Sequence, residues 1–547
     1  MKRYDTIMIL GLLLGSYSSQ AQQEPDSPFA WLFNVIDERL WNQDTVGISG
    51  STVAIDRFGE AVADGDFNND GWQDLAIGIP NHDFFFGAIL NTGTVLVIYG
   101  TPNGLDPDNH QYLYQTFDNS GSNLETLNGI EANDQFGQSI ASGDFNCDGF
   151  DDLAVGTPNE SVILSGSTRS NVGAINIFYA SASGFADNGQ GSTFIWQGSG
   201  LGTSFNGSIS AGDRFGWAMV TGNFDGDTHN GNRCVDLAVS TPFEDFGNAD
   251  QIQNAGQVDV FYGDPAGLDG ANRDSLSQNT FGIDDSAESN DQFGRSLAAS
   301  RFRSDVVFSD LAVGVPGEMV DGEANAGIVQ VFYGAASGLQ ANADDEIWHQ
   351  GDGIIGVPEN NDRFGQTLTT GNFNGDQAFD LAVGVTGEDL NGDGVFAAGA
   401  VNIIYGGVAG LSTTGNQIFH QNTDGINGVA ENSDQFGDAL TAGDLNYDLY
   451  TDLVVGVPRE DGLAGAFHII YGGNSGLTIE DNIYQNSGSL SGDEMAYVMT
   501  VGDFGAGPEL VVGLPGDDSI DGENDSGSVR VYSFENPDVI FADDFDG

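Results

Sequence analysis

The chain has 547 residues, with 81 Asp and Glu against 14 Lys and Arg, which gives a formal net charge of −67 at pH 7. A surface this negative repels the phosphates of nucleic acids and of anionic lipids, so we expect no nucleic-acid partner. Cations are the small partners that such a chain favours.

The first 21 residues have the pattern of a secretory signal peptide. Lys2 and Arg3 precede an apolar run, IMILGLLLG, and Ser19 and Ala21 frame a small-x-small cleavage site. No later stretch approaches 18 consecutive apolar residues, so we expect no membrane span. The sequence therefore predicts an exported protein, secreted or held at the cell surface or in a periplasm, with residues 22–37 as a linker.

One sequence unit recurs seven times after this linker. Each copy opens with an Asp two residues before Phe-Gly and continues through an alternating segment, a polar loop and an apolar run that ends near Gly-x-Pro. A third alternating segment follows, such as TVLVIYG, and then a weaker fourth one that ends near Gln, such as IWHQ. The copies open at Asp56, Asp134, Asp213, Asp291, Asp362 and Asp434, with a worn copy at Asp493.

Four short alternating segments per unit predict a four-stranded antiparallel sheet. One such sheet cannot bury both of its faces, whereas sheets stacked around an axis can. We therefore predict an all-β fold, a seven-bladed β-propeller, over residues 38–534. An acidic tail at 535–547 would follow it.

The chain's beginning supplies a strand that its end lacks. The last copy stops after its third segment, SVRVYSF, which would leave an open sheet edge. The segment LWNQ, Leu40 to Gln43, matches the fourth segments IWHQ and IFHQ, and Gln43 precedes Asp56 by 13 residues, as Gln421 precedes Asp434. We predict that residues 38–44 form the outer strand of the last blade and close the ring.

The repeated motifs, Phe-Gly and Gly-x-Pro with an Asp-rich loop between them, resemble the FG-GAP repeat of the integrin alpha-chain propeller. The resemblance implies seven blades and calcium ions in the loops that join the first two strands of certain blades. These loops would lie opposite the face that integrins use for ligand and for their beta subunit. No segment resembles the integrin legs, transmembrane helix or cytoplasmic tail, so we do not expect integrin-type signalling.

The polar loops carry the hard oxygens that calcium prefers, at positions 1, 3 and 5 and in a later carboxylate. We therefore predict four or five structural Ca²⁺ sites, against the alternative that Asp and Asn merely form turns. The predicted ligands are, loop by loop, Asp66, Asn68, Asp70 and Asp74; Asp144, Asn146, Asp148 and Asp152; Asn223, Asp225, Asp227 and Asp236; Asn372, Asn374, Asp376 and Asp380; and Asp444, Asn446, Asp448 and Asp452.

The loops differ in how closely they match the calcium-binding pattern. The fifth and sixth loops have Gln377 and Leu449 where the first two have a turn glycine, and the third has an insertion, THNGNR, which leaves open whether it binds an ion. In the fourth loop Arg301 and Arg303 occupy positions 1 and 3, so a guanidinium paired with Asp305 or Asp310 would replace the ion. The seventh loop is too short to wrap a cation, which indicates that the ion is structural and that a blade can lose it.

The two cysteines lie in neighbouring loops. Cys147 is inside the second loop, and Cys234 comes just before the closing Asp of the third. A disulfide between them and a pair of free thiols both remain open.

The sequence contains no catalytic constellation. Its six histidines are scattered among different repeats. Phospholipases D that act on glycosylphosphatidylinositol anchors also contain FG-GAP repeats, after a catalytic domain, but residues 22–37 offer no room for one. We therefore expect no enzyme.

The remaining expectation is a monomeric binding module that recognises an extracellular protein in adhesion. The alternatives are a lectin-like propeller that binds glycan and a structural repeat protein of the cell envelope. Phe84, Phe85 and Phe86 form a run in a loop between the second and third strands of the first blade. They are candidate ligand contacts, although the same run would also suit a local core.

Overall fold

The computed structural model describes most of the repeat region and leaves the ends of the chain outside. The described residues are 35–43, 45, 55–83, 89–115, 130–164, 167–186, 192–197, 209–247, 251–268, 272–280, 283, 285–339, 346–390, 394–486, 491–505, 507–518 and 525–534. The predicted signal peptide, most of the linker and the acidic tail lie outside these residues.

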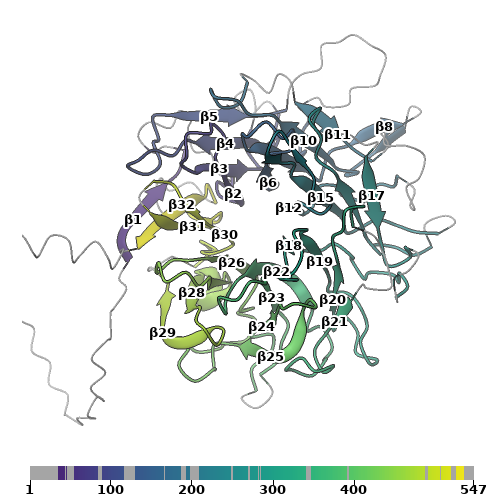
Figure 1. The fold of residues 1–547 in the computed structure, drawn as a ribbon, viewed down its shortest axis with the longest axis vertical. Coiled ribbons are helices and arrows are strands. Elements are labelled where there is room, and N and C mark those ends of the chain that lie inside the picture. The colour runs from purple at the N-terminus through teal and green to yellow at the C-terminus, as the bar shows by residue number, and fades with distance from the viewer. Residues whose placement is uncertain are drawn as a thin grey trace, which may run out of the picture. The chain divides into compact units, whose positions relative to one another are not determined.

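The described strands form seven four-stranded sheets, the blades of a propeller (Figure 1). Neighbouring strands in each sheet are antiparallel, and the innermost strands of successive blades contact one another all the way round the ring. The fold is therefore the predicted all-β seven-bladed propeller.

The blades are described here from the axis outward. Blade 1 contains β2 (Ala61–Gly65), β3 (Asp74–Ile79), β4 (Thr94–Ile98) and β5 (His110–Leu113). Blade 2 contains β6 (Ser139–Gly143), β7 (Asp152–Thr157), β10 (Ala174–Phe178) and β11 (Thr193–Ile195). Blade 3 contains β12 (Met219–Gly222), β15 (Asp236–Thr241), β16 (Gln257–Phe261) and β17 (Arg273–Leu276). Blade 4 contains β18 (Leu297–Ser300), β19 (Asp310–Val315), β20 (Ile328–Phe332) and β21 (Glu346–Trp348).

The remaining blades follow the same plan. Blade 5 contains β22 (Phe364–Gly371), β23 (Asp380–Val385), β24 (Ala400–Tyr405) and β25 (Ser412–Phe419). Blade 6 contains β26 (Ala439–Gly443), β27 (Asp452–Val457), β28 (Ala466–Tyr471) and β29 (Thr478–Gln485). Blade 7 contains β30 (Val498–Asp503), β31 (Pro508–Leu514), β32 (Ser528–Phe534) and β1 (Val35–Trp41). Outside the blades are the hairpins β8 (Val162–Leu164) with β9 (Ser167–Arg169) and β13 (Thr228–His229) with β14 (Asn232–Arg233), and one short turn, α1 (Glu460–Leu463).

The ring closes as the sequence predicts, with the first strand of the chain completing the last blade. Figure 1 shows β1, in purple, beside β32, in yellow, and Leu40 is paired with Arg530 and Trp41 with Val529. The strand spans Val35–Trp41, a few residues earlier than expected, so Gln43 lies just beyond it. The closing pair therefore joins the two ends of the repeat region.

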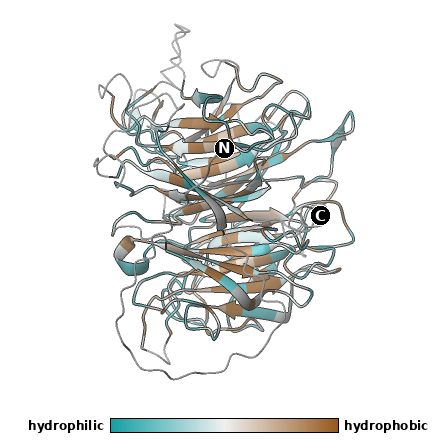
Figure 2. Ribbon diagram, turned by 90° about the vertical axis from the view of Figure 1, so that its left-hand side faces the viewer, coloured by the Kyte–Doolittle hydropathy of each residue, from teal (hydrophilic) through white to brown (hydrophobic). Residues whose placement is uncertain are grey.

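The hydrophobic core is divided into seams between blades. Each of the main clusters takes side chains from two adjacent blades, as where Leu75 of β3 packs with Val511 of β31. Figure 2 shows the hydrophobic residues, in brown, concentrated along the strands. Burial on both faces by the neighbouring sheets explains why the second strand of each blade is an apolar run, and why the third strand is buried along its whole length even where its residues alternate.

The Phe-Gly motif sits in these seams. Phe58 and Phe136 are fully buried, and the following glycines have left-handed backbone angles, with φ of 87° at Gly59 and 91° at Gly137. A Cβ on Gly137 would lie 2.8 Å from the Thr94 carbonyl oxygen of the preceding blade, so a side chain at this position would force the two blades apart. The motif therefore sets the spacing between blades.

Candidate functional site

The Asp-rich loops lie together at one end of the blades, which we call the hairpin end. Each joins the first two strands of a blade, as between Gly65 and Asp74, which face one another in the ladder. The Phe-Gly motifs and the Gly-x-Pro corners lie at the opposite end, which we call the Phe-Gly end. This arrangement follows from the antiparallel register.

The carboxylate that closes each loop is a buried brace of the hairpin. Asp74 accepts hydrogen bonds from the backbone N–H of Phe67 at 2.9 Å and of Gly100 at 2.8 Å, and it is fully buried. The equivalent residues accept the same pair of backbone hydrogen bonds, namely Asp152, Asp236, Asp310, Asp380 and Asp452. Because Asp310 does so in a loop without the calcium pattern, this brace does not depend on an ion.

The first, second and sixth loops share one geometry, with Asp at position 1. In the first loop Asp66 accepts hydrogen bonds from the backbone N–H of Asp70 at 3.0 Å and of Gly71 at 2.9 Å. Asp144 and Asp444 make the same two bonds in their loops. Position 6 has a left-handed backbone in all three, so Leu449 adopts a φ of 73° where the others have glycine.

The third and fifth loops have Asn at position 1 and a second geometry. The Asn223 amide donates to the Asp227 carbonyl at 3.0 Å, and the Asn372 amide donates to the Asp376 carbonyl at 2.7 Å. The side-chain oxygens of Asn223 and Asn372 are buried and accept no hydrogen bond. These two loops therefore present an unused hard oxygen where the Asp loops use theirs internally.

The third loop provides the tightest oxygen cluster among the predicted sites. One oxygen each of Asp225, Asp227 and Asp236 lies within 4.8 Å of the others. Burial, with the nearby charge of Asp225, raises the pKa of Asp227 to about 6. Together with the unused Asn223 oxygen, this cluster has the chemistry of a calcium site, in which the ion would neutralise the crowded carboxylates.

In the fourth loop an arginine lies beside the closing carboxylate, as the sequence suggested. The Arg303 guanidinium donates to Asp310 at 2.8 Å and to the Gly334 carbonyl at 2.7 Å. Of the two candidate partners, Asp310 is the one that pairs. The guanidinium also lies 4.6 Å from the centre of the Tyr333 ring.

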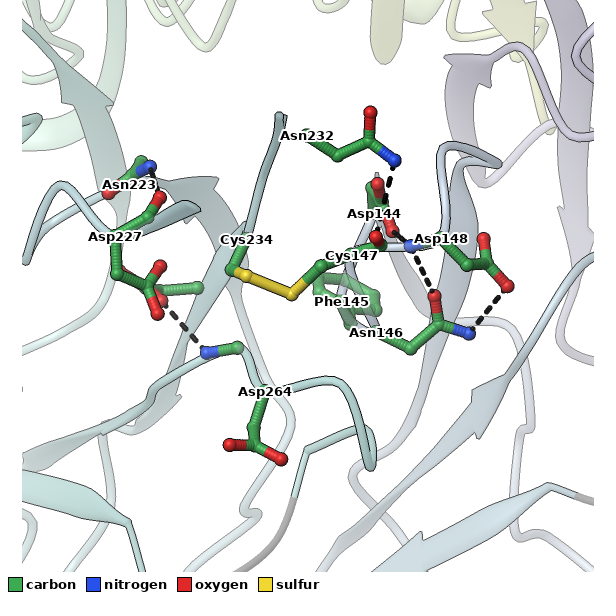
Figure 3. Close-up of a disulfide and its surroundings, with 12 residues drawn as sticks. Asp144, Phe145, Asn146, Cys147, Asp148, Asn223, Asp227, Asn232, Cys234 and Asp264 are labelled. Atoms are coloured by element: carbon green, nitrogen blue, oxygen red, sulfur yellow. Dashed lines mark hydrogen bonds between the residues drawn. A yellow bond between two sulfur atoms is a disulfide. The ribbon is translucent and has the colours of Figure 1, made fainter. Parts of the chain in front are cut away.

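Cys147 and Cys234 form a disulfide between the second and third loops (Figure 3). Their Cα atoms lie 4.7 Å apart, and the insertion in the third loop forms the β13–β14 hairpin just before Cys234. Of the two possibilities that the sequence left open, the structure therefore shows the cross-link, between blades 2 and 3.

Buried carboxylates at the Phe-Gly end escaped the sequence analysis. In five seams the Gln that ends one blade donates from Nε2 to a Glu of the next blade, at 2.6 to 2.9 Å. The pairs are Gln115 with Glu160, Gln197 with Glu244, Gln278 with Glu318, Gln350 with Glu388, and Gln421 with Glu460. In the sequence, each of these Glu residues stands two positions after the Pro of the Gly-x-Pro corner, or after the Thr that replaces it, and this spacing could have identified them.

The first of these Glu residues shows their electrostatics. Burial raises the pKa of Glu160 well above its usual value, and the charge of Asp134, from the Asp-x-Phe-Gly motif, adds to the rise. At the seam where β1 closes the ring, His82 stands in place of the Glu and lies 3.5 Å from Asp56. The seams between adjacent blades therefore hold buried acidic side chains close to one another.

Phe84, Phe85 and Phe86, the candidate ligand contacts, lie outside the described residues, so their assignment to a ligand site stays a prediction. No helix within the described ranges is long and apolar enough to cross a membrane.

Two adjoining cavities open at the Phe-Gly end, beside the innermost strands. They measure about 360 and 380 Å³ and share the side chains of Trp217, Arg295, Arg363 and Gln366. Trp217 precedes β12, Arg295 precedes β18, and Arg363 and Gln366 lie at the start of β22. Since these strands surround the axis in Figure 1, the cavities lie near the axis of the propeller, and we call them the axial cavities.

Comparison with known families and proteins agrees with the repeat pattern. The FG-GAP repeat family matches residues 58–98 and 136–175. Phosphatidylinositol-glycan-specific phospholipase D of Rattus norvegicus is 31% identical over 212 residues, which cover 38% of this chain and 21% of the rat protein. Integrin alpha-PS2 of Drosophila melanogaster is 31% identical over 267 residues, 47% of this chain and 16% of the integrin.

The matched segment spans about a fifth or less of each of these relatives. Among solved structures, the exotype rhamnogalacturonan lyase YesX overlaps 87% of this chain and 72% of its own, with 12% identity and a TM-score of 0.39. The Dos1 propeller overlaps 90% of this chain and 94% of its own, with 10% identity and a TM-score of 0.36. Overlaps this loose carry no functional information.

The repeats, the seven blades and these matches agree with one another. The chain is an FG-GAP repeat protein that forms a seven-bladed propeller, distantly related to integrin alpha chains and to phosphatidylinositol-glycan-specific phospholipase D.

Proposed function

We propose that the protein is an exported, calcium-stabilised propeller that binds an extracellular ligand without transforming it. The hairpin end would hold the ions, with the Asn223, Asp225, Asp227 and Asp236 cluster as its best-formed site. The disulfide between two hairpins supports an oxidising compartment. Extracellular relatives such as the integrins support the same location.

The observation that carries the binding role is the pair of axial cavities at the end opposite the hairpins. Their volumes fall within the range of about 300–1,000 Å³ that is usual for ligand pockets. In this proposal, ions at the hairpin end stabilise the fold, and the cavities at the Phe-Gly end bind the ligand. The sequence placed protein adhesion first, whereas a small polar cavity favours the glycan alternative.

A parallel screen on purified protein tests this function. The protein is applied to a glycan array and to immobilised extracellular-matrix proteins, each with calcium and with excess chelator. We expect calcium-supported retention on one of the two surfaces. Retention on neither would contradict a binding role, and turnover of a retained ligand would contradict the non-enzymatic assignment. The variant Phe85→Ala, assayed alongside, tests the predicted loop contact.

A further inference from the structure

The axial cavities gather positive charge in a chain that has little of it. Arg295, Arg363 and Arg459 line them, and Arg214 lies beside Trp217. These are four of only 14 basic residues in a chain of net charge −67. A concentration of arginine at one point on such a protein needs a physical reason.

None of these four guanidinium groups forms an ion pair within the described part of the chain. By contrast, Arg39, Arg273 and Arg303 each pair with a buried carboxylate. The one acidic side chain that lines the cavities is Asp438, against three lining arginines. The cavities therefore keep a surplus of positive charge.

Aromatic contacts hold the cluster in place. The Arg295 guanidinium lies 4.5 Å from the centre of the Trp217 ring, and that of Arg214 lies 5.5 Å from it. Phe243 packs edge-on against Trp217, with ring centres 5.4 Å apart. Burial lowers the pKa of Arg295, and the charges of Arg363 and Arg214 add to this effect while Asp438 opposes it. The arrangement crowds like charges that an incoming anion would relieve.

The remaining lining is rich in neutral amides. Gln292, Gln366 and Gln435 line the cavities. An amide donates and accepts, which suits the hydroxyl groups of a sugar. A guanidinium matches the two oxygens of a carboxylate with paired N–H donors. The lining thus combines groups for hydroxyls with groups for a carboxylate.

From this geometry we propose that the axial cavities bind a uronic acid unit of an extracellular glycan, with its carboxylate on Arg363 and Arg295. The proposal rests on the proposed binding function and names its ligand class. The negative charge of the chain excludes densely sulfated glycans from this ligand class, because the surrounding surface would repel them. The ligand is therefore a sugar with isolated carboxylates.

Titration calorimetry on the full exported chain with calcium tests the proposal. The probes are galacturonate and digalacturonate, with galactose as the neutral match, and acetate, sulfate and an Asp-rich peptide as other anions. We expect the uronates to bind at least tenfold more tightly than galactose and than each of the other anions. Tighter binding of the peptide, equal binding of galactose, or no binding of uronates would overturn the proposal.

Two variants locate the site. Arg363 is exposed, so Arg363→Gln should fold normally and weaken uronate binding at least tenfold. Arg169 is equally exposed, on the β8–β9 hairpin outside both cavities, and Arg169→Gln should leave binding unchanged. An unchanged affinity in Arg363→Gln, with a melting curve like that of the parent, refutes the site. Capture of an extracellular protein without uronate binding would refute this inference and leave the binding function standing.

Discussion

The third and fourth hairpins differ in how the negative charge of their buried carboxylates is balanced. In the third, Asp225, Asp227 and Asp236 crowd together with the unused oxygen of Asn223. In the fourth, Arg303 reaches the buried Asp310, so the positive charge belongs to the chain itself. Both loops keep the same backbone brace at the first residue of the second strand.

This difference separates what the hairpin needs for folding from what it needs for charge balance. The brace forms with or without a cation, whereas the acidic cluster requires something to offset its repulsion. An ion makes that offset depend on the surroundings, and an arginine makes it permanent. The blades should therefore differ in their response to calcium.

Removal of calcium tests this contrast with the largest expected effect. An ion that binds only the folded state adds about 2.7 kcal/mol per site when calcium is 100-fold above its dissociation constant. We expect excess chelator to lower the melting temperature in calorimetry and to open the acidic hairpins to proteases. Cleavage should spare the fourth hairpin. An identical melting curve in chelator and in calcium would contradict the predicted ions.

Loss of the internal cation should destabilise the protein whether calcium is present or not. Arg303→Gln leaves Asp310 buried without its partner, and breaking such a pair costs about 3 kcal/mol. Urea denaturation with and without chelator measures this cost. Arg301→Gln is the control, because the half-buried Arg301 donates to the Gln377 carbonyl and pairs with no carboxylate among the described residues. Equal losses of stability in the two variants would show that the Arg303–Asp310 pair does not stabilise the loop.

A proton is the third way to offset a buried carboxylate, and it operates at the Phe-Gly end. Burial raises the pKa of Glu460 to about 7, from 4.5 in a model peptide. Because the pKa of Glu460 is higher in the folded state than in the unfolded state, the contribution of its proton to the free energy of unfolding is complete below pH 4.5. This contribution is lost as the pH rises through 7. With chelator present, Glu460→Gln should reduce this loss by about 1–2 kcal/mol after allowance for solvent screening.

Urea denaturation at a series of pH values between 4.5 and 8 gives the measurement. The exposed Asp424→Asn is the matched control and should keep the slope of the parent protein. A parent protein whose stability rises across this interval would show that the seam carboxylates are not the groups that titrate.

The smallest effect should come from the backbone of the sixth hairpin. Leu449 has a φ of 73° and is 88% exposed, at the position where the first two loops have glycine. A left-handed backbone costs a non-glycine residue about 1–2 kcal/mol, so Leu449→Gly should stabilise the protein by about 1 kcal/mol. Gly71→Ala in the first hairpin is the reciprocal change and should destabilise by a similar amount. Opposite signs in thermal unfolding would confirm the shared geometry.

Local patterns in the sequence were sufficient for the fold. Six Phe-Gly motifs and one worn copy predicted the blades, and the likeness of Leu40–Gln43 to other fourth strands predicted the closure. The pairing of Arg303 with Asp310 was also accessible, because the two residues stand only seven apart in one loop.

The seams and the axial cavities were not accessible in this way. Gln421 and Glu460 are 39 residues apart and belong to different blades, so no local spacing links them. Trp217, Arg295 and Arg363 come from three repeats and meet only around the axis. The sequence shows that position 1 is Asn in two of the predicted calcium hairpins and Asp in three. It does not show that the Asn side-chain oxygen is left without a hydrogen bond, because that depends on the backbone geometry of the loop.

The closure by β1 has a consequence for how the protein is made. Glu38 and Arg530, which are hydrogen-bonded across the β1–β32 ladder, are separated by 492 residues. At about 5–20 residues per second, ribosomes need about 25–100 s to bridge that interval. During this time the first strand has no partner and the early blades stack as an open arc with two unpaired edges. Synthesis of the final strand is thus the step that turns the arc into a ring, and a chain released before it remains a template for aggregation.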